Sequence, residues 1–148
     1  AAALKASGVD FNVSLIFGGQ IAGEGMRLFQ VYSPGNFIEA TSETPYFQIG
    51  ESKYGKPILD RVIENDMSLD EVAKCCLISM DSSIKSNLSV GLPLDLMCYE
   101  LDSLSVRQHK LIDLQDAYFS SIRDSWGQQL RTVFNELPNP HYWETPKS

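Results

Sequence analysis

Residues 66–85, DMSLDEVAKCCLISMDSSIK, carry the clearest structural signal in the chain. Ser68 and Glu71 have the spacing of a capping box, in which the hydroxyl accepts from the backbone N–H three residues on and the carboxylate accepts from the first backbone N–H. The spacing predicts a long helix from residue 69, with one continuous apolar face. That face consists of Leu69, Val72, Ala73, Cys76, Leu77, Met80 and Ile84, and it places Cys76 in the core.

Upstream of this helix the pattern changes from a helical period to runs typical of strands. Residues 12–20, 26–33 and 37–40 are alternating or mostly apolar, which predicts three antiparallel strands. Pro34 and Gly35 at the centre of residues 33–36 favour a type II turn between the second and third strands. Pro57 fits the first turn of a short helix that ends near residue 65.

Downstream, a polar loop over residues 86–91 leads to a buried strand over 93–101. We expect two short extended segments after it, on either side of a turn at Gln108-His109. Asp116 then opens a second long helix, which Pro138 ends. Its apolar face comprises Phe119, Ile122, Trp126, Leu130, Val133, Phe134 and Leu137. Strands, two helices, strands and a helix in this order predict an α+β fold.

Composition limits the classes of function. The 148 residues are 43% hydrophobic, enough for one domain with a core, and the net charge is −7. An acidic chain offers no basic face for polyanions, so we expect neither nucleic acid nor an anionic membrane as a partner. The longest apolar runs are about four residues, against roughly 20 for a membrane-spanning helix. No basic segment followed by an apolar one indicates a secretory signal.

The cysteines and histidines narrow the chemistry further. Cys75, Cys76 and Cys98 are odd in number and lack C-x-x-C spacing, which favours reduced thiols in a cytoplasm. Only His109 and His141 are present, which is too few for most metal sites and for Ser-His machinery. We therefore expect no metal and no cofactor.

Three short motifs resemble catalytic signatures without completing them. The glycines at 18–19 and 23–25 match neither G-x-G-x-x-G nor the Walker pattern, so a hairpin turn is favoured over a phosphate loop. Residues 50–54, GESKY, lack the second glycine of G-x-S-x-G. Residues 82–85, SSIK, fit S-x-x-K, but neither S-D-N nor K-T-G accompanies them. Helix ends and turns explain all three.

Two blocks of sequence carry a family resemblance. Residues 46–61, YFQIGESKYGKPILDR, followed by residues 66–73, DMSLDEVA, resemble the proteasome β-subunit superfamily of N-terminal-nucleophile hydrolases. Within it, the similarity is greatest to the bacterial Anbu (ancestral β subunit) group. The resemblance extends over nearly all of residues 13–137.

The resemblance implies a four-layer αββα sandwich and a threonine-type peptidase. In that family an N-terminal threonine attacks peptide carbonyls, and its own α-amine takes the hydroxyl proton, so no histidine is needed. Residue 1 here is alanine. We therefore expect residues 1–148 to be the C-terminal part of one such domain, with 138–148 as a tail, and the N-terminal strands and first helices to be missing. We expect these 148 residues alone to hydrolyse no peptide.

The resemblance also assigns supporting residues. Ser52 matches a serine before the third helix of the family that supports the amine, and helix-entry capping is the alternative role. Ser89 and Gly91 match the serine and second glycine of a later D-x-x-S-G-G loop. In that loop Ser86 takes the position of the aspartate and Val90 that of the first glycine, so a carboxylate partner is missing or replaced.

The resemblance implies identical subunits in a ring or an open spiral, acting on a peptide or protein substrate in the bacterial cytoplasm. Two other functions stay open. One is a self-assembling scaffold that has lost the chemistry, which the alanine at residue 1 and Ser86 suggest. The other is an N-terminal-nucleophile amidohydrolase acting on small amides, because the same fold can serve either reaction.

Overall fold

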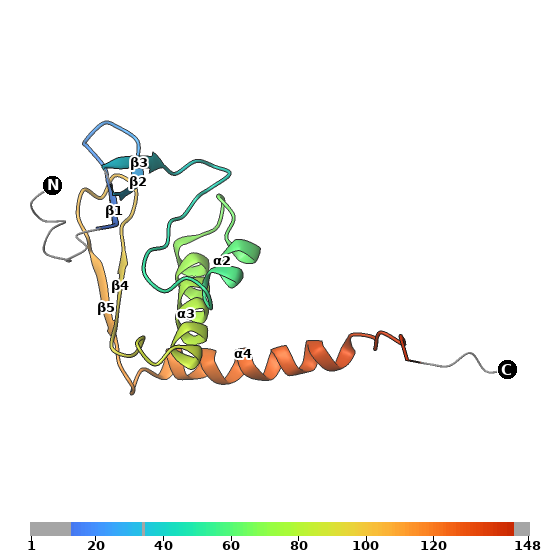
Figure 1. The fold of residues 1–148 in the computed structure, drawn as a ribbon. Coiled ribbons are helices and arrows are strands. Elements are labelled where there is room, and N and C mark those ends of the chain that lie inside the picture. Colours follow the sequence, from blue (N-terminus) through green and yellow to red (C-terminus); the bar gives the residue numbers. More distant parts are fainter. Residues whose placement is uncertain (1–12, 34, 144–148) are drawn as a thin grey trace, which may run out of the picture.

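The structure, a computed structural model, describes residues 13–33 and 35–143 (Figure 1). Its elements form an α+β arrangement in the predicted order of strands, two helices, strands and a helix. They are β1 (Leu15–Gly19), β2 (Arg27–Tyr32), β3 (Asn36–Glu39), α2 (Lys56–Val62), α3 (Leu69–Ser86), β4 (Leu94–Cys98), β5 (Gln108–Ile112) and α4 (Ala117–Glu136).

The first sheet is the predicted antiparallel meander in the order β1-β2-β3. Tyr32 pairs with Asn36, and the Gly35 N–H donates to the Tyr32 carbonyl at 2.7 Å. The turn thus closes one residue earlier than the predicted turn over 33–36. Gly35 has a φ of 105°, a conformation that glycine adopts without a steric penalty. Asn12 and Pro34, which belong to the predicted strand and turn, lie outside the described residues.

Helix α3 begins as predicted. Ser68 accepts from the Glu71 N–H, and Glu71 accepts from the Ser68 N–H at 3.0 Å, so the capping box is complete. The predicted burial of Cys76 is wrong in detail, because Cys75 is the buried cysteine and Cys76 is half-buried. Figure 1 shows why: α2 lies beside α3, α4 runs past its lower end, and the β4–β5 hairpin stands on its other side. A helix covered from several directions buries more than one stripe.

The main core lies where α3, the β4–β5 hairpin and the first half of α4 meet. Apolar packing of this kind is the dominant stabilising term in folding. Its buried members are Leu77, Ile112, Phe119 and Ile122, with Ile78, Ile84, Leu92, Leu94 and Leu96 packed against them. A second buried group, Leu59, Cys75, Ser79 and Ser83, lines the contact between α2 and α3.

The second sheet differs from the prediction at Gln108 and His109. Both residues lie inside β5, where they pair with Cys98 and Met97, and the connection from β4 to β5 spans residues 99–107. His109 Nε2 lies 2.7 Å from an Asp95 carboxylate oxygen. A local polar dipeptide suggests a turn, but backbone pairing with β4 extends it. Met97, predicted as buried, is 59% exposed because the strand alternates between two faces.

Helix α4 begins at the predicted cap. Asp116 accepts from the Phe119 N–H at 2.8 Å, and this backbone bond lowers the pKa of the Asp116 carboxyl. On the first half of the helix, Arg123 donates to buried Asp81 of α3 at 2.9 Å. The second half runs past the other described elements (Figure 1), and its apolar side chains are exposed. No described helix is both long and apolar enough to cross a membrane.

Candidate functional site

The structure brings together two loops that lie far apart in the sequence. One loop, residues 50–55, leads into α2, and the other, residues 87–91, leaves α3. The Asn87 Nδ2 donates to Glu51 Oε2 at 2.8 Å, a bond across 36 residues. These are the loops in which Ser52 and Ser89 were predicted as supporting residues. One hydrogen bond therefore joins the two halves of the candidate site.

Asn87 holds the second loop in place through both its backbone and its side chain. Its N–H donates to the Ser83 carbonyl at 2.8 Å as α3 ends, and its own carbonyl accepts from Val90. Its Oδ1 accepts from the Ser89 N–H at 2.9 Å and from the Ser89 hydroxyl at 2.7 Å. Asparagine side chains commonly bond to the backbone two residues on in this way. Ser89 is exposed, with its hydroxyl oriented by Asn87.

Ser52 lies between Glu51 and the first turn of α2, and it is half-buried. Its carbonyl accepts from the Lys56 N–H at 3.1 Å. The alternative role in helix-entry capping finds no support, because the residue at the N-cap of α2 is Gly55 and no side chain caps the helix. Within the described chain the Ser52 hydroxyl makes no hydrogen bond, so it remains available to a group arriving from elsewhere.

Ser86 is the last residue of α3 and is exposed. No hydrogen bond joins its hydroxyl to Ser52 or Ser89 within residues 13–33 and 35–143. The structure thus links the loops of two of the three predicted serines and leaves Ser86 outside that link.

Glu51 and Asn87 are the site residues that the sequence analysis missed. Glu51 Oε1 also accepts from the Lys53 N–H at 2.8 Å, so the carboxylate binds both loops. The Glu51 carbonyl accepts from Gln48 Nε2 at 3.2 Å, whereas Gln48 Oε1 is buried without a partner in the described chain. A carboxylate next to Ser52 was a local signal for Glu51. The pairing with Asn87 had none, because it depends on how α2 packs on α3.

Gly55 determines how closely the first loop approaches α3. A methyl group at this position would meet the Ser79 hydroxyl, the Ser79 carbonyl at 2.9 Å and the Ser83 hydroxyl at 2.9 Å. Ser79 and Ser83 lie one turn apart, and the Ser83 hydroxyl donates to the Ser79 carbonyl at 3.1 Å. The small residues on both elements let the loop lie directly against the helix.

A charged cluster joins Tyr46, in the segment before this loop, to α2. Lys56 Nζ lies 2.6 Å from an Asp60 oxygen and 3.1 Å from the Tyr46 hydroxyl, which itself donates to Asp60. The bond with Asp60 raises the pKa of Lys56, and the same bond lowers the pKa of Asp60. Burial raises the pKa of Tyr46. All three groups are paired with one another, so the cluster holds the segment that contains Tyr46 against α2.

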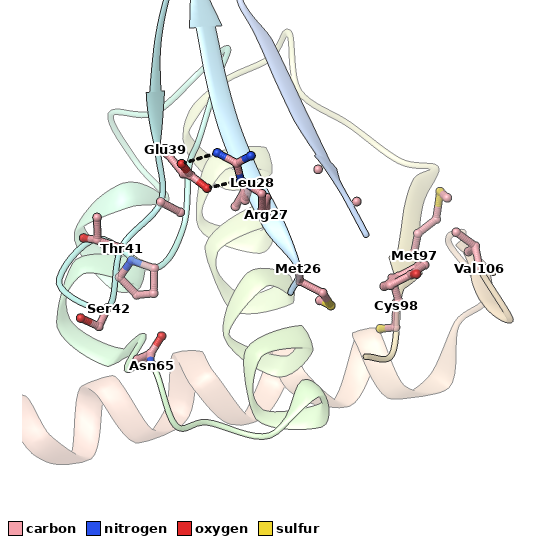
Figure 2. Close-up of a pocket in the computed structure, with 15 residues that line it drawn as sticks. Met26, Arg27, Leu28, Glu39, Thr41, Ser42, Asn65, Met97, Cys98 and Val106 are labelled. Carbon is pink, nitrogen blue, oxygen red and sulfur yellow. Dashed lines mark hydrogen bonds and ion pairs between the residues drawn. The ribbon is translucent and has the colours of Figure 1, made fainter. Parts of the chain in front are cut away.

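A large cavity in the described part of the chain is not lined by Ser52, Ser86 or Ser89. It has a volume of about 850 Å³ and lies between the β1–β3 sheet and the β4–β5 hairpin (Figure 2). The Arg27–Glu39 ion pair, at 2.7 Å, forms part of its wall. Its lining also includes Gly18, Gly19, Met26, Leu28, Ala40, Thr41, Ser42, Pro45, Asn65, Met97, Cys98, Tyr99 and Val106. The cavity lies next to the exposed strand β1, so we interpret it as a space between the two sheets and not as the site of the serines.

No three His, Cys, Asp or Glu side chains in the described chain lie together as metal ligands. Its three cysteines are free thiols, and burial raises the pKa of both Cys75 and Cys76. A raised pKa keeps a thiol protonated and unreactive at neutral pH. The polar groups that converge in the site are therefore hydroxyls, one amide and one carboxylate.

Comparison with known proteins identifies the family. The model of the family described as "Proteasome subunit" matches residues 2–92, more than half of the chain. Among curated proteins no match was found.

Solved structures agree with that family. "Anbu (ancestral beta-subunit) from Yersinia bercovieri" is 58% identical, with a TM-score of 0.85 over 93% of this chain and 58% of that one. Anbu from Hyphomicrobium sp. strain MC1 is 54% identical, with a TM-score of 0.85 over 93% and 59%. The structure named "Helical Assembly of the Anbu Complex from Pseudomonas aeruginosa" is 46% identical, with a TM-score of 0.89 over 96% and 59%.

This chain spans less than two thirds of the length of these Anbu chains. The Anbu structures match nearly all of this chain. The match confirms the resemblance inferred from residues 46–61 and 66–73, and it also confirms the α+β fold of the proteasome type. The chain belongs to the proteasome subunit family and is similar to the Anbu proteins of bacteria.

Proposed function

We propose that this chain is the C-terminal part of a proteasome-type threonine peptidase, and that Ser52 and Ser89 support an N-terminal nucleophile carried outside residues 1–148. The observation that carries the proposal is the Glu51–Asn87 bond, which joins the loops of these two serines. Family membership supplies the reaction class.

The proposed reaction uses only groups that such a site offers. The nucleophile's hydroxyl oxygen bonds to the peptide carbonyl carbon while its proton passes to the α-amine, whose ordinary pKa is about 7.7–8.0. The resulting ammonium then gives the proton to the leaving peptide nitrogen as the C–N bond breaks. Water hydrolyses the ester that remains. In this scheme the Ser52 and Ser89 hydroxyls hold the amine, and Ser86 occupies the third supporting position.

We also propose that the described chain is one part of a larger single domain. Three apolar side chains of the first sheet, Leu15, Phe17 and Phe37, are more than half exposed. Strands of this kind are stable only when a face is covered. In this proposal, the part of the domain that the relatives have beyond the matched region covers that face and the cavity beside β1. Free thiols support a reducing compartment, the bacterial cytoplasm.

Identical subunits are the proposed partners, because one similar structure is named a helical assembly. The exposed second half of α4, with the half-buried Trp126 before it and the C-cap residue Leu137 after it, offers a self-complementary contact. Trp126, Leu130, Val133 and Leu137 follow steps of four, three and four residues, which read the same from either end. An antiparallel α4 pair therefore sets Trp126 opposite Leu137 and Leu130 opposite Val133, as a twofold interface requires.

Peptide turnover by the full-length protein tests the enzymatic proposal. Replacing its N-terminal nucleophile by alanine should abolish cleavage of a fluorogenic peptide amide, and Ser89→Ala should lower kcat/KM by at least about tenfold. Ser121→Ala on the exposed face of α4 is the matched control and should leave turnover unchanged. Assembly without any turnover would support the scaffold. Cleavage of small amides but not of peptides would support the amidohydrolase.

A further inference from the structure

We infer that Glu51 is a positioning residue: through Asn87 it orients the Ser89 hydroxyl as a hydrogen-bond acceptor facing the reacting amine. The inference deepens the proposed function and rests on it. It concerns the direction in which each hydrogen bond of the Glu51–Asn87–Ser89 chain runs.

The direction is set at the Glu51 end. An ionised carboxylate accepts hydrogen bonds and donates none. Oε1 accepts from the Lys53 N–H at 2.8 Å, and Oε2 faces Asn87 at 2.8 Å. Asn87 must therefore turn its NH₂ group towards Glu51 and its carbonyl oxygen towards Ser89.

The Asn87 oxygen in turn sets the orientation of Ser89. It accepts from the Ser89 N–H at 2.9 Å and from the Ser89 hydroxyl at 2.7 Å. Because the hydroxyl donates its one proton to Asn87, the lone pairs of its oxygen are left to accept hydrogen bonds from other groups. Such an oxygen suits a donor-only cation, and an ammonium group has three donors. An accepting Ser89 thus stabilises the protonated amine.

Glu51 also supplies a carboxylate that its loop partner lacks. The family pattern places an aspartate at the position of Ser86, whose hydroxyl is outside the link between the loops. Here the negative charge comes from the residue before Ser52 and reaches Ser89 through an amide. The charge thus lies at the same junction although it belongs to the other loop.

Other charged groups flank this link. Lys53 lies in the same loop. Lys56, Asp60 and Arg61 lie on α2, where the first two pair with each other and Arg61 donates to a backbone carbonyl. Lys85 lies in the last turn of α3. We call the Glu51–Asn87–Ser89 chain of hydrogen bonds the relay. A charge-matched control is needed to separate the effect of the relay from a general change in the electrostatic field.

Glu51→Gln breaks the direction of the chain at nearly constant shape. The Lys53 N–H requires the Gln oxygen, so the Gln NH₂ faces the Asn87 NH₂. Either this contact opens or the Asn87 amide turns round and directs a donor at Ser89. In both cases Ser89 no longer accepts reliably and the charge is gone, so the ammonium is less favoured and the amine pKa falls.

The test measures the pKa of the N-terminal α-amine in the full-length protein. It follows how the rate at which an added reagent acylates this amine depends on pH. Glu51→Gln should lower this pKa by roughly 0.5 to 1 unit, and should move the acid limb of kcat/KM to lower pH. Glu51→Asp keeps the negative charge, so it should lower the amine pKa by less than Glu51→Gln does. Glu43→Gln, the same charge change in an exposed loop residue, should leave the pKa unchanged.

A Ser89→Ala background separates the relay from a through-space effect. There Glu51→Gln should produce a smaller shift than in the wild type, because the hydroxyl it orients is absent. An equal shift in both backgrounds, or no shift at all, would overturn the inference. Because acylation needs no turnover, a protein that shows the pKa shift but cleaves nothing would refute the proposed peptidase and leave the relay standing.

Discussion

Gly55 shows how a single residue positions the candidate site. The first loop lies against α3 only because no side chain stands between its backbone and Ser79. Gly55→Ala must push the loop away from α3 or displace that backbone. We expect a loss of about 1–3 kcal/mol in the free energy of unfolding, in line with other overpacked interiors. Urea denaturation followed by far-UV circular dichroism measures it.

Gly25→Ala is the matched control for this residue. A methyl group there meets nothing within 4 Å. The free energy of unfolding should change by no more than about 0.5 kcal/mol. Equal losses in the two variants would show that the effect does not come from the contact with Ser79.

At the scale of an element, the capping box makes the stability of α3 depend on pH. The hydrogen bond from the Ser68 hydroxyl lowers the pKa of Glu71 below its unfolded value of about 4.3. A carboxyl with a depressed folded pKa contributes stability above the unfolded pKa, and that contribution is lost as pH falls through the folded pKa. Glu71→Gln keeps the cap geometry without the titration. From pH 5 to pH 3, the variant should therefore lose less stability than the wild type.

Thermal unfolding at several pH values measures that difference. Asp70→Gln provides a comparison, since Asp70 also lies in the first turn but is not the residue that bonds back to Ser68. If wild type and Glu71→Gln lost stability equally between pH 5 and pH 3, the Ser68–Glu71 bond would not carry the dependence.

At the scale of the whole molecule, the exposed half of α4 should control self-association. Leu130, Val133, Phe134 and Leu137 are each at least half exposed. Leu130→Glu places a charge in the proposed α4 pair, and should raise the dissociation constant of the assembly at least about tenfold. Analytical ultracentrifugation of the full-length protein measures the change. Gln128→Glu, on the opposite face of the helix, should leave the assembly intact.

Disulfide crosslinking tests the direction of that pair. In an antiparallel arrangement, a mixture of Leu130→Cys and Val133→Cys proteins should form a mixed disulfide faster than either protein alone. Unmixed wild type shows the background from the native cysteines. Crosslinking within the Leu130→Cys protein at a faster rate would indicate parallel helices, and intact assembly of Leu130→Glu would show that α4 contacts something else.

Local signals predicted much of the fold. The caps of α3 and α4, at Ser68 and Asp116, are side-chain bonds that span three residues, so the sequence alone places both helix starts. The three-strand meander follows from runs of apolar residues next to a Pro-Gly turn. The family resemblance depends on contiguous blocks, and for that reason it could be drawn from residues 46–61 and 66–73 without coordinates.

What the sequence by itself determined, then, were features that depend on residues close together in the chain: helix starts, strand runs and the contiguous blocks that carry the family resemblance. Only the tertiary structure decided that Cys75 and not Cys76 is buried, that Gln108 and His109 extend a strand, and that Glu51 meets Asn87. Each of these depends on packing between elements distant in the chain, where covering surfaces and backbone pairing override the local pattern.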